Sequence, residues 1–502
     1  MSDAGAVGSG TGDAGAVGSG TGDAGAVGSG MGDVGAVGSG TSDEVAMGSG
    51  TSDAGATSSG TSNERGTSIG VSNDAEHPRE TAVTDSQRPT VLVRMADAGD
   101  LYVSWRWRDD ITGGGVAAIP EAQVAELVAR VSTALPAPSA DRIESALTAG
   151  AFADYDSEHE LAQALSRTLL PHGLAAQLHD LYLRGVRPHI RLQPSPRTAQ
   201  LPWELLAPDP GLRLLDIADI SQLAPAGLIN APGRVPRSWV QTRDLPVVAV
   251  LDPRVPGFRA DSALGSVLGR MFAHAPLTER IAGYLADDRL RPAVPDPVEA
   301  FRRTDQDRAW LSAALRAGAS RLLYVGHVTA AAPESGRSEE ARLHLACADD
   351  VPGFAAPERT HRPLSARDLI LGTQTLDGAA RTGPELWPIP SRVALIACES
   401  GGDLRFGETL GLLAAMINGG AELVTAGRWA LPTDLAFQRF AHVDAARRPL
   451  QETVCAIDAA HEQPDPIAAL MQWQRERLAA WREERSVPDS PMLWAAFATV
   501  SA

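Results

Sequence analysis

Short apolar runs alternate with helical patterns over the last two-thirds of the chain. Five runs have the length and composition of strands buried on both faces: residues 189–192, 247–251, 321–326, 392–397 and 421–427. Strands of this kind, separated by helices, indicate a mostly parallel sheet with helices on both faces. The pattern therefore predicts an α/β domain, which we place at residues 154–502.

The preceding segment, residues 88–153, predicts a β-hairpin followed by a helix. Period-two alternation over residues 91–108 indicates two strands around a turn, and the second strand carries tryptophans on one face and arginines on the other. Such a pattern can stack on nucleic-acid bases, but we favour packing of the tryptophan face against the protein. Helical spacing then follows in residues 124–135, and Pro136 ends it.

Residues 1–87 are dominated by a decapeptide repeat, clearest in TGDAGAVGSG and decaying into TSNERGTSIG. Units of Gly, Ala, Ser and Asp bury too little apolar surface to offset the conformational entropy lost on ordering. We therefore expect a disordered, low-complexity tail. It is either a spacer or partner-binding segment, or a neutral repeat expansion.

Composition disfavours several classes of protein. The 502 residues carry a net charge of -18, which opposes non-specific attraction to nucleic acid and to anionic membranes, so we expect neither partner. The three cysteines, Cys347, Cys398 and Cys455, lie far apart and lack metal-ligand spacing; we expect no disulfide framework, no metal and no cofactor. The sequence shows no signal peptide and no apolar run of about 18 residues, which predicts a cytoplasmic protein.

Two reactive residues follow predicted strands. His327 comes directly after residues 321–326, and Cys398 comes directly after residues 392–397. Singly, each is typical of a protein core. Adjacent parallel strands, however, bring their carboxyl ends together, and an imidazole beside a thiol can activate it as a nucleophile. The glycine-rich turn after Cys398 lacks both phosphate-binding motifs, GxxxxGK[ST] and GxGxxG, which disfavours a nucleotide-binding domain.

The sequence around these residues resembles the CHAT domain, a caspase-like cysteine peptidase module related to separases and metacaspases. The resemblance is carried by GH at residues 326–327, by ACESG at 397–401, by the helix sequence GETLGLLAAMINGGA and by GRW at 427–429. LPWELL resembles an early strand-turn motif of that family, RPLSARDLI the helix before the cysteine strand, and SPMLWAAFATV the closing strand. Together these motifs span about residues 160–502.

The resemblance implies a cysteine endopeptidase that cleaves a partner protein. Cys398 would be the nucleophile and His327 the general acid, and the backbone N–H groups of Cys398 and Val328 would bind the oxyanion. Relatives usually have glycine at the position of Val328, so a donor geometry that needs glycine's positive φ would be lost. The alternative is therefore a catalytically impaired CHAT scaffold that acts as an interaction module.

Two further expectations follow from the family. Asp434 loosely matches an acidic residue of some basic-P1 pockets, and it is either a substrate contact or a structural cap. The family's biology implies regulation, in a prokaryotic defence or cell-death system, with a protein substrate and a separate activator protein as partners. Glu399, next to the thiol, would by itself raise its pKa, so the activating charge must come from His327.

Deleting residues 1–85 should leave the melting temperature within about one or two degrees, because a segment without a core contributes little to the enthalpy of unfolding. Calorimetry of the full and shortened chains measures this. A large fall in melting temperature would mean that the repeats pack on the folded domain.

Overall fold

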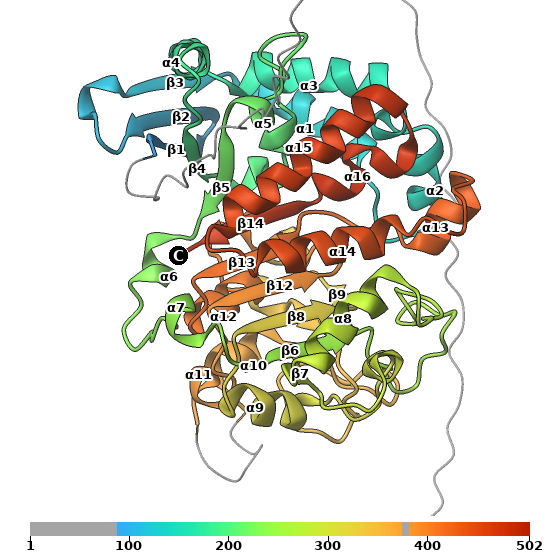
Figure 1. Cartoon of the computed structure of the whole chain (residues 1–502). Helices are drawn as coiled ribbons and strands as arrows, with labels where there is room; N and C mark the ends of the chain where they lie inside the picture. The colour runs from blue at the N-terminus through green and yellow to red at the C-terminus, as the bar shows by residue number, and fades with distance from the viewer. Residues whose placement is uncertain (1–87, 374–380) are drawn as a thin grey trace, which may run out of the picture. The chain divides into compact units, whose positions relative to one another are not determined.

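A computed structural model describes residues 88–373 and 381–502, and the predicted disordered tail, residues 1–87, lies outside the described residues. In the described part, one large sheet has the strand order β3-β2-β1-β4-β5-β14-β13-β12-β8-β6-β7 (Figure 1). Its strands are β1 (Thr90–Ala98), β2 (Asp100–Trp107), β3 (Gly115–Ile119), β4 (His189–Gln193), β5 (Asp219–Leu223), β6 (Val247–Leu251), β7 (Leu290–Arg291), β8 (Arg321–Val325), β12 (Arg392–Ile396), β13 (Leu423–Gly427) and β14 (Phe497–Ser501). A small second sheet holds β9 (Val328–Thr329), β10 (Arg342–Leu343) and β11 (Leu364–Ser365).

The large sheet consists of two parallel blocks. Strands β13, β12, β8, β6 and β7 run in one direction, and β14, β5, β4 and β1 run in the other. The blocks meet where β14 pairs antiparallel with β13. All five predicted strands are present, and the predicted α/β class with a mostly parallel sheet is confirmed.

Helices connect the strands. The longer ones are α1 (Glu121–Ala134), α2 (Ala140–Thr148), α3 (Tyr155–Leu169), α4 (His172–Leu183), α8 (Pro276–Ala286), α9 (Arg308–Arg316), α10 (Ala366–Leu371), α12 (Leu412–Asn418), α13 (Asp434–Phe440), α14 (Pro449–Ala460) and α15 (Pro466–Glu484). Single turns form α5 (Leu214–Ile217), α6 (Ala226–Ile229), α7 (Trp239–Thr242), α11 (Gly383–Leu386) and α16 (Pro491–Trp494). Among the described helices, none is both long and apolar enough to cross a bilayer.

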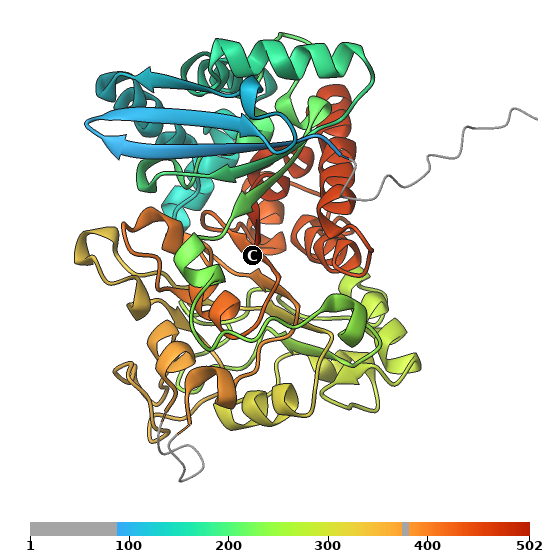
Figure 2. The ribbon, with the colours of Figure 1, turned by 90° about the vertical axis from the view of Figure 1, so that its left-hand side faces the viewer.

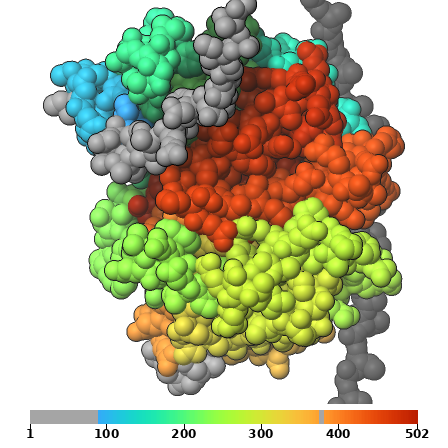
Figure 3. All heavy atoms as spheres, in the orientation of Figure 1, coloured from blue at the N-terminus to red at the C-terminus, as the bar shows by residue number. Residues whose placement is uncertain are grey.

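The sheet is buried on both faces, as its apolar strands require. Alternate residues of β6 point to opposite sides: Val247 and Leu251 join a core with α8, α14 and α15, whereas Val248 and Val250 join a core with α9, α10 and α12. Figure 3 shows the red surface of α14 and α15 next to the yellow-green surface around α8. This burial on both faces explains why these strands are continuous apolar runs rather than alternating ones.

The predicted hairpin is confirmed as β1 and β2, joined through Gly99 at φ 74°. It belongs to the large sheet, because β1 pairs parallel with β4; Figure 2 shows the blue strands beside the green ones. Trp105 is buried, and its Nε1 donates to Gln177 Oε1 at 3.1 Å. The tryptophan face therefore packs inside the protein, which confirms packing over base stacking. The predicted boundary at residues 153 and 154 stays a prediction.

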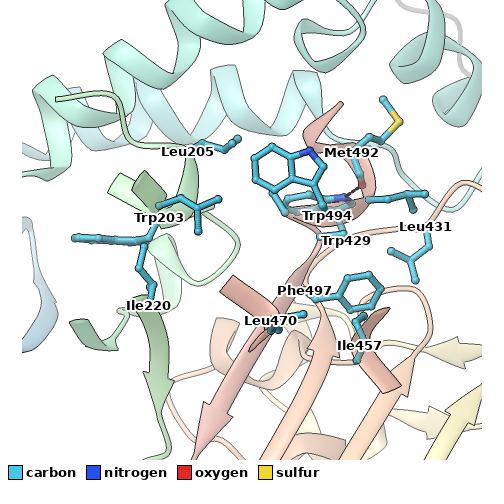
Figure 4. Packing of buried hydrophobic residues seen from close by; sticks show 14 of the residues in the cluster. Trp203, Leu205, Ile220, Trp429, Leu431, Ile457, Leu470, Met492, Trp494 and Phe497 are labelled. Carbon is cyan, nitrogen blue, oxygen red and sulfur yellow. Dashed lines mark hydrogen bonds between the residues drawn. The ribbon is translucent and has the colours of Figure 1, made fainter. Parts of the chain in front are cut away.

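The LPWELL segment, residues 201–206, differs from the predicted strand and turn. Trp203–Leu205 form a 3-10 turn, in which Leu206 N donates to Trp203 O at 3.2 Å. Trp203 and Leu205 belong to the same buried core as Trp429 and Trp494 (Figure 4). The predicted closing strand, residues 490–500, likewise begins with α16, and β14 starts only at Phe497.

One buried ion pair joins this turn to the end of β13. Glu204 accepts two hydrogen bonds from Arg428, at 2.9 Å and 2.8 Å, and both side chains are 3% exposed. Arg428 Nη1 also donates to Ala495 O at 2.9 Å, directly after α16. The pair thereby links the early turn, the loop after β13 and the C-terminal segment.

Glu204→Gln should lower the free energy of unfolding by about 3 to 5 kcal/mol, because Arg428 would remain buried without its counter-charge. The exposed pair of Arg184 and Asp180 is the control, and Asp180→Asn should cost no more than about 1 kcal/mol. Urea unfolding measures both. If both substitutions lower the free energy of unfolding equally, burial does not determine how much the pair of Glu204 and Arg428 stabilises the protein.

Candidate active site

His327 and Cys398 lie at the carboxyl ends of neighbouring parallel strands. Val325 of β8 is in register with Ile396 of β12, and each candidate residue stands two positions further along. Gly326 N donates to Ile396 O at 3.3 Å, so the pairing continues to the residue before His327. The sequence-based prediction that both residues share one edge of the sheet is therefore confirmed.

The Cys398 thiol is partly buried. Its Sγ accepts a hydrogen bond from Leu431 N at 3.3 Å. Burial raises the pKa of the Cys398 thiol, the Leu431 N–H lowers it, and the neighbouring Glu399 carboxylate raises it further. Burial dominates, so the thiol keeps its proton above the pH range usual for cysteine.

The chain reverses sharply after Cys398, and β13 holds it in place. Glu399 has φ 50°, and its N–H donates to Trp429 O at 3.1 Å. Ser400 Oγ donates to Leu395 O at 2.7 Å and accepts from Gly427 N at 2.8 Å. This anchored turn fixes the backbone N–H of Cys398 at the edge of the sheet.

In the glycine-rich turn after Cys398, the carboxylate of Asp403 binds backbone N–H groups at the start of α12. Asp403 Oδ2 accepts from Ala414 N at 3.0 Å in the first turn of α12, and burial raises the pKa of Asp403 to about 6. A Cβ on Gly411 would lie 2.4 Å from Asp403 Oδ1, so glycine is required there for this close approach. Asp403 thus occupies the N–H groups that a phosphate would need, which argues against a nucleotide-binding loop.

His327 is held by a loop that sequence reasoning missed. Its Nε2 donates to Gly265 O at 3.1 Å, because a carbonyl oxygen only accepts. The neutral ring therefore carries its proton on Nε2 and leaves Nδ1 unprotonated. Gly265 lies between β6 and α8 in a stretch without helical or strand periodicity, so no sequence pattern marked it.

Burial lowers the pKa of His327, the Gly265 carbonyl and Asp252 raise it, and Arg302 lowers it. Among the described residues, no hydrogen bond joins His327 to Cys398. The lowered pKa of the imidazole and the raised pKa of the thiol both favour neutral groups at neutral pH. His327 and Cys398 therefore form a neutral imidazole and a neutral thiol rather than an imidazolium and a thiolate.

Val328 lies in β9, beside the candidate histidine. His344 N donates to His327 O at 3.1 Å, and hydrogen-bonded positions alternate along an antiparallel pair, so the N–H of Val328 points away from β10. Val328 is not among the described non-glycine residues with positive φ. Valine thus adopts this backbone without the strain that a position requiring glycine would impose. Its role as an oxyanion donor stays a prediction.

Asp434 opens α13 and is buried, at 2% exposure. Its Oδ1 accepts from Leu450 N at 2.8 Å, which ties α13 to α14. Its Oδ2 is buried without a hydrogen-bond partner in the described part of the chain, and burial raises the pKa of Asp434 to about 6. The contact seen is structural, and contact with a substrate would require the carboxylate to be uncovered.

The described residues contain no group of three or more His, Cys, Asp or Glu side chains that could hold a metal ion. The remaining cysteines differ from Cys398 in position: Cys347 is fully buried, and Cys455 lies in α14. Burial raises the pKa of Cys455 to about 12. Of the three thiols, only that of Cys398 stands at the carboxyl end of a strand in the parallel block.

Residues 159–502 match the family model of the CHAT domain, which is more than half of the chain. The chain belongs to the CHAT domain family. Its fold is also similar to that of separase in two crystal structures of the Saccharomyces cerevisiae separase-securin complex, each with 9% sequence identity. The TM-scores are 0.36 and 0.41, with 82% and 83% of this chain covered; the CHAT protein spans only 30% of the separase chains. No curated protein matches its sequence.

The pH dependence of alkylation tests the resting state of the thiol. Because only the thiolate reacts and the pKa of Cys398 is raised, iodoacetamide labelling of Cys398 should still be accelerating above about pH 8.5. Cys455 should react more slowly throughout. Peptide mass spectrometry measures each site, and a Cys398 rate already level by pH 7 would instead demonstrate a preformed ion pair.

Proposed function

We propose that this CHAT protein is a cysteine endopeptidase that cleaves a partner protein with a Cys398–His327 dyad. The observation that carries the proposal is the placement of both side chains at the carboxyl ends of β12 and β8, which are paired in register. Membership of the CHAT family, a caspase-like peptidase family, adds to it. Neither Cys347, which is fully buried, nor Cys455, which lies in α14, stands at the carboxyl end of a strand in the parallel block.

The proposed reaction follows from the roles of these groups. The thiol proton passes to Nδ1 of His327, and the thiolate attacks the scissile carbonyl carbon. The N–H groups of Cys398 and Val328 stabilise the oxyanion of the tetrahedral intermediate. His327 then protonates the leaving amine as the C–N bond breaks, and water hydrolyses the resulting thioester to free the enzyme.

The neutral state of the dyad supports regulation. The thiol donates no hydrogen bond to His327, and burial holds both groups uncharged. A separate activator protein would bring the ring and the sulfur together and so favour charge transfer between them. We place this protease in the cytoplasm of a prokaryote, in a defence or cell-death system, following the biology of the family.

We also propose that the enzyme prefers a basic P1 residue in its substrate. If the activated form exposes Asp434, its carboxylate would pair with a basic P1 side chain, and Oδ2 is already free of internal partners among the described residues. The scaffold alternative is favoured by the same missing Cys–His hydrogen bond. An impaired scaffold would bind partner proteins without any need for the Cys398 sulfur.

Cys398→Ala should abolish proteolysis and keep the melting temperature, because it removes one partly exposed sulfur at a strand end. Newly formed protein N-termini, measured by mass spectrometry in activated host cells, report cleavage. Cys455→Ala, which also removes a partly buried sulfur, is the matched control and should keep full cleavage.

Two outcomes would contradict the assignment. If new N-termini persist in Cys398→Ala but vanish in Cys455→Ala, the nucleophile is Cys455 and the assignment of Cys398 is wrong. If no new N-termini depend on any of the three cysteines while partner binding survives in Cys398→Ala, the protein is a scaffold.

A further inference from the structure

The carbonyl oxygen of Gly265 is shared by two donors. His327 Nε2 donates to it at 3.1 Å, and Arg302 Nη1 donates to it at 3.0 Å. A carbonyl oxygen has two lone pairs, so these contacts use its full accepting capacity. The orientation of the imidazole is thus linked to a guanidinium that lies outside the Cys-His pair.

Asp252 pins the loop that carries this carbonyl. It follows β6 directly, and its N–H donates to Val325 O at 2.6 Å, so it is attached to the end of β8. Its carboxylate accepts from Ser266 Oγ at 2.5 Å and from Val267 N at 3.1 Å. It also accepts from Arg302 Nη1 at 3.2 Å, so one guanidinium nitrogen bridges the carboxylate and the Gly265 carbonyl.

The backbone around this arrangement is conformationally demanding. Asp252 has φ 51° and Arg302 has φ 54°, in the left-handed region that non-glycine residues rarely occupy. A Cβ on Gly265 would lie 2.2 Å from Ala260 O, so only glycine allows the loop to fold this tightly. Such backbone conformations are strained and persist only where surrounding contacts impose them.

The two charges act on His327 in opposite directions. Asp252 favours the imidazolium form, and Arg302 disfavours it. Two more titratable groups among the described residues lie near His327: His344, directly after β10, and Tyr324, whose hydroxyl contacts His327 O. Burial lowers the pKa of His344 to about 3 and raises the pKa of Tyr324, so both stay neutral at physiological pH. The charge balance at His327 therefore depends on Asp252 and Arg302.

We propose that Asp252 and Arg302 are positioning residues for His327: through the Gly265 carbonyl they hold the imidazole with its proton on Nε2 and keep Nδ1 free for the thiol and the leaving amine. The catalytic meaning of this arrangement rests on the proposed peptidase function. The tautomer and the charge coupling do not, because both are properties of the folded chain.

Histidine NMR of the full chain carrying Cys398→Ala tests the proposal without catalysis. With ¹⁵N-labelled histidine, and the His327 signals assigned by their loss in His327→Gln, the neutral ring should show its proton on Nε2. Arg302→Gln should raise the pKa of His327 and Asp252→Asn should lower it, each by about one pH unit. If Asp252 and Arg302 only stabilised the fold, the two substitutions would not shift the pKa of His327 in opposite directions.

The chain offers a matched control and a rescue. Arg303 is adjacent and equally exposed, 23% against 24% for Arg302, but it pairs with Asp305, so Arg303→Gln should leave the His327 titration unchanged. Arg302→Lys keeps the charge and should keep the wild-type pKa. If Asp252→Asn fails to fold, Arg302→Gln, at a partly exposed site, still decides the question.

The inference and the proposed function fail separately. A neutral His327 protonated on Nδ1, or an Arg302→Gln variant that titrates like wild type, overturns the positioning role even if Cys398 cleaves proteins. If the predicted tautomer and the opposed pKa shifts are found but cleavage does not depend on Cys398, only the proposed peptidase function is wrong. In the activated peptidase, Arg302→Gln should lower kcat and leave KM unchanged.

Discussion

The register between β8 and β12 is the constraint on which the candidate site depends. It sets His327 and Cys398 at one edge, each two residues beyond a paired position. The hydroxyl of Tyr324 fixes the exit from β8, because its single proton is shared between His327 O at 2.6 Å and His344 O at 2.9 Å. A slip of one residue would turn every side chain of β8 to the opposite core, so the apolar packing of both faces enforces the register.

The burial of residues at this edge of the sheet also determines the protonation states of His327 and Cys398. The low-dielectric surroundings disfavour charge on both members of the dyad, and the nearby fixed charges of Asp252, Arg302 and Glu399 adjust that balance. Greater solvent access would weaken the burial that keeps both groups neutral. The packing of this edge therefore determines the protonation states of both side chains.

The sequence predicts the parts of the fold that repeat a simple physical pattern. The five apolar strands and the hairpin are found because burial on two faces, or on one, leaves a direct trace in residue type. Strand β5, DISQL, was not found, because its polar residues are buried but paired: Asp219 with Arg88 and Arg475, and Ser221 with His189. Partners so distant in the chain cannot be inferred from composition.

The same limit applies to the site. His327 and Cys398 are predictable because each ends an apolar strand and carries reactive chemistry. Gly265, Asp252 and Arg302 lie in aperiodic loops, and their roles arise from hydrogen bonds across the fold. Val328 lies in a strand without positive φ, which the residue type alone does not reveal, and its role as an oxyanion donor stays a prediction.

The position of β14 has a consequence for how the protein is made. This strand lies between β5 of its own block and β13 of the other block, and Ser501 Oγ donates to Gln222 O of β5, 279 positions earlier in the chain. Long-range pairings of this kind form slowly. The strand pairing that joins the two blocks into one sheet can form only after β14 has left the ribosome, whereas the contact between Glu204 and Arg428 becomes possible earlier.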